Sequence, residues 1–312
     1  MSHAYGNAPT GILQPVEVRL PSVDHFARRA RRLQELAQRN EPLGEFLAFM
    51  SQLVSAQQAA FERGTPSWQP AADSFQLALE HGMPPLNAQA LLANIDLTDE
   101  VGILLDALAL QVGAAQRPLI ETLHALPPER LRQLAEQIIA GDAGEKHERG
   151  LMPLIAAALQ VAWLRLVQTL PRAPQRPSGE VRTLCPSCGL PPVASLVETD
   201  PASSGVRYLQ CGLCSTQWYL ERSLCSACEH SGNLEYLSLT SESNAEEGSS
   251  DSPAQAEACG DCNSYLKHFP RSLDAEVEPL ADDLASLPLD LLLAEEGRYQ
   301  RSGFNPLLIV EG

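Results

Sequence analysis

The sequence predicts a multidomain protein of the α + small β class: an N-terminal all-α helical domain followed by two tandem, small metal-binding subdomains. Two observations lead to this prediction. All eight cysteines form Cys-x-x-Cys pairs between positions 185 and 262, whereas the first 184 residues contain no cysteine. Those first residues instead carry apolar side chains at helical spacing, interrupted by glycine and proline. With 312 residues and 44% hydrophobic content, the chain is long enough for two modest globular domains.

The N-terminal part is predicted to comprise an extended segment at 1–21 and a helical domain at 22–170. Ser22 or Asp24 can cap a first helix that runs to Arg39. Glycine and proline punctuate the pattern after it. Further helices are predicted at 43–63, 74–80, 88–93, 99–115, 128–140 and 145–170. A Pro-rich linker at 171–183 then separates the helices from the first cysteine.

The cysteine pairs have the spacing of metal-binding knuckles. Two intervening residues let a tight turn present both sulfurs to one ion, and eight thiols are the ligand count of two tetrahedral tetrathiolate sites. In the first pair, Pro186 presets one turn angle and Gly189 can adopt the positive φ that completes the loop. This Cys-Pro-x-Cys-Gly sequence resembles the knuckles of rubredoxins and zinc ribbons. A redox dithiol or a disulfide framework fits less well, because no secretory signal peptide is recognisable and the cysteine-free region is long.

Joining neighbouring pairs gives two sites. Site 1 would contain Cys185, Cys188, Cys211 and Cys214, and site 2 would contain Cys225, Cys228, Cys259 and Cys262. Residues 192–209 favour this pairing, because two strand-like runs flank a turn at 200–205 and so form a β-hairpin between the first two knuckles. A cross-braced arrangement, first pair with third and second with fourth, remains the alternative. The predicted subdomains are two rubredoxin-like or zinc-ribbon units, at 184–220 and at 221–272, the second with an acidic loop at 240–256.

The last predicted segment spans 273–312 and contains a short helix. Asp282 and Asp283 could hold an ion there, but a solvated pair at a helix start is the simpler interpretation. His230 and His268 lie near the knuckles in sequence, and we expect them at the surface because eight cysteines already complete two sites.

No catalytic constellation is recognisable, so we predict that the protein is not an enzyme. The sequence has no phosphate-binding loop with lysine, no His-Glu-x-x-His and no nucleophile elbow. A nucleic-acid partner is also not expected, because the net charge is −17 and residues 241–312 hold 15 acidic against 4 basic residues. No apolar run reaches the roughly 18 residues of a membrane span, so no membrane insertion is predicted. We expect a cytoplasmic protein whose thiols stay reduced.

Four residues are candidates for contact with a protein partner. Arg28 and Arg29 belong to the conspicuous basic cluster at 28–32, whose simpler interpretation is a solvated helix face. Trp218 and Tyr219 lie on a predicted ribbon strand, where aromatic side chains more commonly pack the small core.

The chain resembles the FdhE family, the formate dehydrogenase accessory proteins, over nearly its whole length. In the N-terminal part the resemblance rests on Ile12-Leu13-Gln14-Pro15, Phe26-Ala27-Arg28-Arg29-Ala30 and Glu41-Pro42-Leu43. In the C-terminal part it rests on the four knuckles in order and their flanks, including Arg207-Tyr208-Leu209-Gln210-Cys211, Cys259-Gly260-Asp261-Cys262 and Ala281-Asp282-Asp283-Leu284.

This resemblance implies a cytoplasmic, non-catalytic maturation factor for respiratory formate dehydrogenases. Such a factor is expected to bind the immature catalytic subunit before its export by the twin-arginine pathway and to hold iron in rubredoxin-like sites. Zinc is the alternative metal, because thiolates suit both ions. Two other functions stay open: a rubredoxin-like electron carrier, and a zinc-ribbon module that binds protein or nucleic acid.

Overall fold

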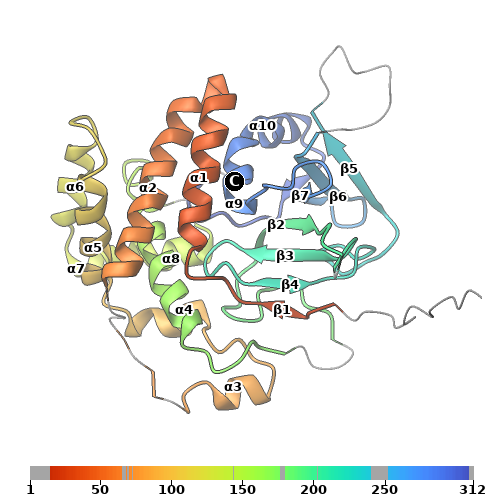
Figure 1. Cartoon of the computed structure of the whole chain (residues 1–312), viewed down its shortest axis with the longest axis horizontal. Helices are drawn as coiled ribbons and strands as arrows, with labels where there is room; N and C mark the ends of the chain where they lie inside the picture. Colours follow the sequence, from red (N-terminus) through yellow and green to blue (C-terminus); the bar gives the residue numbers. More distant parts are fainter. Residues whose placement is uncertain are drawn as a thin grey trace, which may run out of the picture.

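The computed structural model describes residues 15–64, 68, 70–71, 73–142, 144–175, 180–201, 203–239 and 252–308. Helices occupy one side of the molecule and a β-sheet the other, with two further helices packed near the sheet (Figure 1). The N-terminal helices are α1 (His25–Arg39), α2 (Gly44–Arg63), α3 (Gln76–Glu80), α4 (Ala88–Leu91), α5 (Leu97–Ala109), α6 (Arg117–His124), α7 (Pro128–Ala140) and α8 (Met152–Gln168). Most of the predicted acidic loop, from position 240 to 251, lies outside the described residues.

Local chemistry accounts for the start of α5 and the end of α7. Asp96 caps α5, and its carboxylate accepts hydrogen bonds from the backbone N–H groups of Thr98 and Asp99. Helix α7 ends at Gly141, whose φ of 74° is the left-handed conformation that glycine adopts without a Cβ penalty. The predicted helix at 145–170 begins only at Met152 in the structure, and α6 was not predicted.

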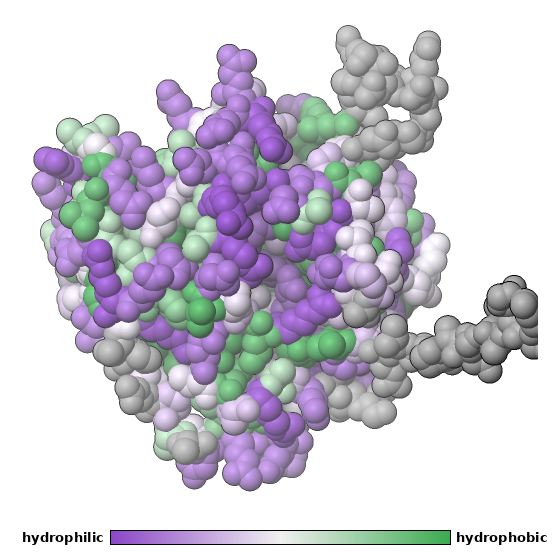
Figure 2. All heavy atoms as spheres, viewed as in Figure 1, coloured by the Kyte–Doolittle hydropathy of each residue, from purple (hydrophilic) through white to green (hydrophobic). Residues whose placement is uncertain are grey.

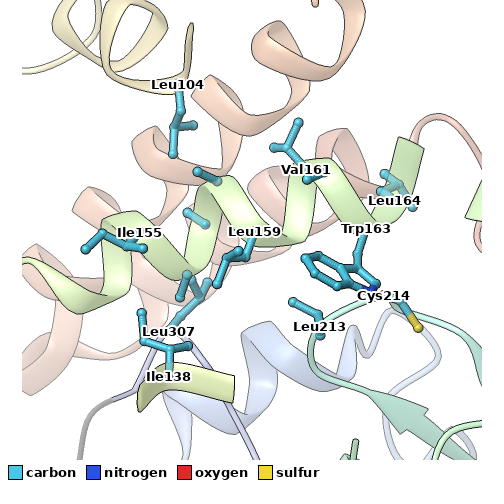
Figure 3. Close-up of a cluster of buried hydrophobic side chains, with 14 of the residues drawn as sticks. Leu104, Ile138, Ile155, Leu159, Val161, Trp163, Leu164, Leu213, Cys214 and Leu307 are labelled. Carbon is cyan, nitrogen blue, oxygen red and sulfur yellow. The ribbon is translucent and has the colours of Figure 1, made fainter. Parts of the chain in front are cut away.

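Helix α8 is the centre of the molecule. Its residues from Met152 to Val167 are buried except for the half-buried Pro153, as expected for a helix that is hydrophobic on all sides. Leu104 of α5 and Ile138 of α7 pack toward it from different sides (Figure 3). At its other end Trp163 contacts the β region, so the helical and metal-binding parts share one hydrophobic core.

The described strands form one eight-stranded sheet. Its members are β1 (Val18–Arg19), β2 (Pro192–Val197), β3 (Arg207–Cys211), β4 (Gln217–Tyr219), β5 (Leu234–Ser238), β6 (Gln255–Cys259), β7 (Ser264–Pro270) and β8 (Gln300–Arg301). The order is β1-β4-β3-β2-β7-β6-β5, with β8 paired to β7. Strands β2–β4 and β5–β7 are therefore two antiparallel ribbons of the same topology, joined by parallel pairing of β2 with β7.

The predicted fold class is confirmed: a helical N-terminal region precedes a β region with two four-cysteine clusters. Three features of the structure were not predicted. The ribbons share one sheet instead of standing apart, and β1 from the N-terminal segment extends that sheet by pairing with β4. The C-terminal segment contains α9 (Pro279–Ala285), α10 (Leu287–Glu296) and β8, where one short helix was expected.

Candidate metal centres

Each ribbon presents two knuckles in the same way. One knuckle lies in the loop that precedes the first strand, and the other lies in the turn between the second and third strands. Cys185 and Cys188 precede β2, and Cys211 and Cys214 lie at the β3–β4 turn. The second ribbon repeats this order with Cys225 and Cys228 before β5 and with Cys259 and Cys262 at the β6–β7 turn.

The residue after each second cysteine has left-handed backbone. These residues are Gly189, Ser215, Glu229 and Asn263, with φ of 81°, 58°, 65° and 55°. In three knuckles the same residue donates its N–H to the carbonyl of the first cysteine, over 2.9 Å for Gly189, 3.1 Å for Glu229 and 3.0 Å for Asn263. The sequence predicted this conformation only at Gly189, because the other three are not glycine and the strain is imposed by the turn.

The sulfur geometry fits tetrahedral metal coordination. The two four-cysteine clusters are Cys185, Cys188, Cys211, Cys214 and Cys225, Cys228, Cys259, Cys262, and within each cluster all four sulfurs lie within 4.8 Å of one another. A tetrathiolate with metal–sulfur bonds of about 2.3 Å separates its sulfurs by about 3.8 Å. Across knuckles, Sγ–Sγ distances are 3.5 and 3.4 Å in the first cluster and 3.8 Å for both pairs in the second. Disulfide bonds of about 2.05 Å are excluded by these distances, so each cluster can hold one metal ion.

The first cluster is sealed inside the core. All four of its cysteines are buried, and Leu213 and Cys214 lie beside Trp163 of α8 (Figure 3). The loop before α4 and the first residue of that helix hold the first knuckle, because Leu86 N–H donates to Ser187 O over 2.8 Å and Ala88 N–H donates to Cys188 O over 3.0 Å. The helical region therefore forms part of the wall of this site.

A second link joins the helices to the other knuckle of the first cluster. Gln160 of α8 donates through Nε2 to the carbonyl of Gly212 over 2.6 Å, and accepts at Oε1 from Gln57 of α2 over 2.8 Å. This role of Gln160 could not be predicted from the sequence, because a lone glutamine on an apolar helix becomes informative only when its partner is known.

Hydroxyl groups accompany the turn knuckles of both clusters. Cys214 Sγ lies 3.2 Å from Thr216 Oγ1, and Cys262 Sγ lies 3.0 Å from Ser264 Oγ. Each hydroxyl follows its cysteine by two positions. A hydroxyl at that position can donate a hydrogen bond to a thiolate. Alignment of the second knuckle with the fourth in the sequence would have revealed this repeat.

Burial has a direct electrostatic effect on the first cluster. It raises the pKa of Cys185 and of Cys188 well above the ordinary thiol value, because an uncompensated thiolate is disfavoured away from water. A bound cation removes this penalty, so occupation of the cluster releases protons and couples metal binding to folding.

The four candidate partner-contact residues divide between interior and surface. Arg29 is fully buried and forms a two-pronged ion pair with Glu278, at 3.1 Å for each contact. Burial by itself raises the pKa of Glu278, but the Arg29 guanidinium holds it below its ordinary value. Trp218 is also buried, and its Nε1 donates to Arg182 O over 3.0 Å. This corrects the expectation for Arg29 and Trp218, whereas Arg28 is exposed and Tyr219 is half-buried.

Two further expectations need correction, one for His268 and one for the pair Asp282 and Asp283. His230 is exposed as expected, but His268 is buried on β7. Asp282 and Asp283 are buried at α9 and are not a solvated pair. Asp282 accepts from Arg32 of α1, and Asp283 accepts from Arg301 through both carboxylate oxygens at 2.7 Å. These carboxylates bind arginine and fasten the C-terminal segment.

Among the described helices, none combines the length and apolarity that a bilayer crossing requires.

Comparison with known proteins covers almost the entire chain. Three sequence profiles match consecutive parts of the chain. The profile described as "FdhE, N-terminal" matches residues 15–180, the one described as "FdhE, central domain" matches residues 184–222, and the one described as "FdhE, C-terminal domain" matches residues 224–308. Protein FdhE of Salmonella paratyphi A is 36% identical over 284 residues, which are 91% of this chain and 87% of that protein. A protein FdhE homolog of Cronobacter sakazakii is 36% identical over 283 residues, with the same two shares.

A solved structure shows the same arrangement in three dimensions. The crystal structure of the FdhE protein from Pseudomonas aeruginosa superposes with a TM-score of 0.82 at 35% identity, and the match covers 95% of this chain and all of that one. Profiles, relatives and fold agree along the helical region and both ribbons. The chain therefore belongs to the FdhE family.

Proposed function

We propose that this protein is a cytoplasmic accessory factor in the maturation of formate dehydrogenase, and that it is not itself an enzyme. It would bind the immature catalytic subunit of a respiratory formate dehydrogenase before export and be required for assembly of the active enzyme. The observation that carries this proposal is the pair of four-cysteine clusters, set into one sheet with a shared helical core, in a chain of the FdhE family.

Metal in the two clusters would have a structural role at least. Each ribbon is too small to bury a core of its own, so the free energy of metal binding becomes free energy of folding. We propose iron as the metal, with zinc as the alternative, because soft thiolate ligands suit both ions. Iron would also permit a one-electron change, which zinc does not. Reduced thiols of this kind persist in the cytoplasm.

The client subunit is proposed to dock at a polar cleft of about 530 Å³ beside α1. The cleft lies where α1, the β2–β3 loop and the residues before α9 meet, and Figure 2 shows hydrophilic residues gathered in this region. Five arginines line it: Arg19, Arg28, Arg31, Arg32 and Arg271. Its five acidic residues are Glu35, Glu198, Asp200, Glu276 and Glu278.

Internal ion pairs neutralise part of this lining. Glu198 pairs with Arg19 and with Arg271, each over 3.0 Å, while Glu278 pairs with the buried Arg29. Arg28 and Arg31 remain exposed on the rim. Arg28 donates to Ser22 Oγ over 3.0 Å and pairs with the exposed Asp24 over 3.7 Å. A client segment with acidic side chains toward α1 would add carboxylate partners to these two exposed guanidinium groups, which fits the strong directional preference of arginine for carboxylates.

A pull-down from formate-respiring cells under anaerobic, reducing conditions tests the proposal. The full chain should retain the formate dehydrogenase catalytic subunit, and a Cys185→Ser/Cys188→Ser variant should lose it because the first cluster no longer forms. An Arg28→Glu/Arg31→Glu variant should fold and bind metal but capture much less client. The matched control is the variant Arg63→Glu/Arg117→Glu, which reverses the charge of two exposed arginines away from the cleft. Absence of the catalytic subunit from the unaltered chain's captured proteins would refute the proposed function.

One observation favours a second candidate, a rubredoxin-like electron carrier. Cys262 of the second cluster is exposed, so that an electron could reach a metal there from solvent. This function requires a reversible one-electron couple and the red colour of a ferric tetrathiolate, whereas a zinc protein is colourless. A nucleic-acid module would instead show binding that falls steeply with salt, and the net charge of −17 disfavours it.

A further inference from the structure

The two clusters have the same ligand arrangement but very different surroundings. In the first cluster all four cysteines are buried, with 0–1% of each residue exposed. In the second cluster Cys225 and Cys259 are buried, Cys228 is partly exposed and Cys262 is exposed. Both clusters therefore offer four thiolate ligands, and they differ in how far those ligands are exposed to water.

The first cluster cannot be reached without opening the core. Backbone hydrogen bonds from Leu86 and Ala88 cover its loop knuckle, and Gln160 of α8 binds the carbonyl of Gly212 in its turn knuckle. The chain is also closely packed around the turn knuckle, because a Cβ added at Gly212 would lie 2.4 Å from Phe304 O. A small molecule must wait for a local unfolding event to reach these sulfurs.

The second cluster lies at the end of its ribbon, under little cover. Its neighbours Glu229, His230 and Asp261 are exposed and polar. Outside the cluster, Cys262 Sγ lies 3.0 Å from Ser264 Oγ, and Ser264 is only half-buried. Besides the β-sheet pairing, Asn233 of the same ribbon holds this turn, because its carbonyl accepts from Gly260 N–H over 2.9 Å and its Nδ2 donates to Asp261 Oδ1 over 3.0 Å. From outside the ribbon, Gln300 N–H donates to Asn263 O over 2.8 Å. One ligand of this site therefore faces solvent.

We propose that the first cluster is a permanent structural centre and that the second is an exchangeable one, opened at Cys262 by small thiols. In the exchange step an incoming thiolate forms a bond to the metal, the metal–Cys262 bond breaks, and the released Cys262 sulfur takes up one proton. No electron is transferred, and the ion stays four-coordinate with Cys225, Cys228 and Cys259. Complete removal of the ion follows when further ligands are replaced.

This inference rests on metal occupancy of both clusters and is independent of any client. Failure to capture formate dehydrogenase would leave the exchange proposal intact. Equal release rates of the two metal ions would overturn the exchange proposal without affecting client binding. The two proposals therefore fail in different experiments.

Metal release from the zinc-loaded full chain provides the first test. With 4-(2-pyridylazo)resorcinol as the acceptor, one of two equivalents should leave at least about ten-fold faster than the other, since the buried cluster must open locally first. Glutathione should accelerate the fast phase in proportion to its concentration and leave the slow phase unchanged. A single release rate for both equivalents, or a slow phase that responds equally to glutathione, would overturn the proposal.

A cysteine variant assigns the phases. Cys262→Ser should abolish or further accelerate the fast equivalent while the slow phase keeps its rate. Cys214→Ser is the matched substitution in the first cluster, because Cys214 holds the same place in its turn knuckle, and it should remove the slow equivalent. If the remaining ion of Cys262→Ser left rapidly, the assignment of the two centres would be reversed.

Because a cysteine variant can fail to fold, the unaltered protein provides an independent readout. The zinc-loaded chain is treated with N-ethylmaleimide for increasing times, and modified cysteines are identified by peptide mass spectrometry. Cys262 should be modified first and Cys228 next, with the first cluster protected until the slow ion leaves. Modification of Cys188 as fast as Cys262 would contradict unequal access.

Discussion

Ser195 Oγ on β2 lies 2.8 Å from His268 Nδ1 on β7, and these two residues are also partners in the parallel pairing that joins the ribbons. Both side chains are buried. One side-chain hydrogen bond thus crosses the junction between the first and second metal-binding ribbon. This junction makes one sheet from two units that the sequence presents as separate.

Removal of this hydrogen bond should weaken the joined sheet. Ser195→Ala leaves a buried imidazole nitrogen without its partner, which costs about 1–3 kcal/mol of unfolding free energy. Urea denaturation of the metal-loaded protein measures the loss. Ser272→Ala is the control, because Ser272 is exposed, and it should change stability by no more than about 0.5 kcal/mol. Equal effects of the two substitutions would show that the Ser195–His268 bond contributes nothing.

A buried ion pair also crosses between the ribbons. Arg207 on β3 and Glu257 on β6 are paired with 0% and 1% of their side chains exposed. Glu257→Gln leaves a buried guanidinium without its counter-charge, and we expect a loss of about 3–5 kcal/mol. The exposed pair Arg132–Glu129 on α7 offers the comparison, since water screens this pair and Glu129→Gln should change the unfolding free energy far less. Urea denaturation midpoints of the two variants, measured in the same buffer, compare the two effects. Similar losses of stability in Glu257→Gln and Glu129→Gln would contradict a special contribution of the buried pair.

Two glycines differ in the room around them. At Gly212 an added Cβ meets the backbone oxygen of Phe304 at 2.4 Å, whereas at Gly102 of α5 there is nothing within 4 Å. Gly212→Ala should therefore destabilise the protein by about 1–3 kcal/mol through overpacking beside the first cluster. Gly102→Ala should stabilise it by about 0.5–1 kcal/mol, because alanine loses less entropy in a helix. Thermal unfolding gives both signs, and a stable Gly212→Ala protein would show that the C-terminal segment is free to move away.

Two buried histidines should make stability fall with acidity. Burial, followed by the charge of Arg29, lowers the pKa of His25 to about 3, and burial, followed by Arg207, lowers that of His268 to about 3. In the unfolded chain both regain a pKa of about 6.5. The unfolded state therefore binds more protons between these values, and stability decreases as the pH falls from about 6.5 toward about 3.

Urea denaturation at about pH 7.5 and about pH 5 tests this dependence. The His25→Gln/His268→Gln protein should lose less stability between the two conditions than the unaltered chain, although both start to lose metal on acidification. An identical decrease in both proteins would mean that other groups, the cysteines included, account for all of it.

The local parts of this protein followed from its sequence. Apolar residues at helical spacing, with glycine at a helix end such as Gly141, predict most helices because the interactions involved span only a few positions. The start of α5 at Leu97, capped by Asp96, was not predicted, because the helix was expected to begin at 99. Asp24, a predicted cap, lies at the N-cap of α1 but makes no side-chain capping hydrogen bond. The hairpin at 192–209 was predicted on the same basis. Helix α6 was missed because its eight residues carry too short a pattern to stand out.

The candidate metal centres were predictable in composition but not in surroundings. Two-residue spacing fixes how a knuckle presents its sulfurs, so the cysteines could be named from the sequence. Left-handed backbone at Ser215, Glu229 and Asn263 was not foreseen, since serine and glutamate rarely adopt it, and asparagine, which adopts it more readily, is also common elsewhere. The sequence also gave no measure of how deeply each cluster is buried.

Only the tertiary structure decided which charged and polar residues are interior. Arg29 and Glu278 are 249 positions apart, and Arg32 and Asp282 are 250 positions apart, yet each pair is buried together. Burial of a charge is tolerated only when an opposite charge is supplied at the same place, and no local pattern reports a partner so distant along the chain. The sequence by itself determined the helices, the knuckles and their ligands. The tertiary structure decided that the two ribbons form one sheet, that Trp218 and His268 are interior, and that one cluster is sealed while the other meets water, because each depends on contacts between segments remote in sequence.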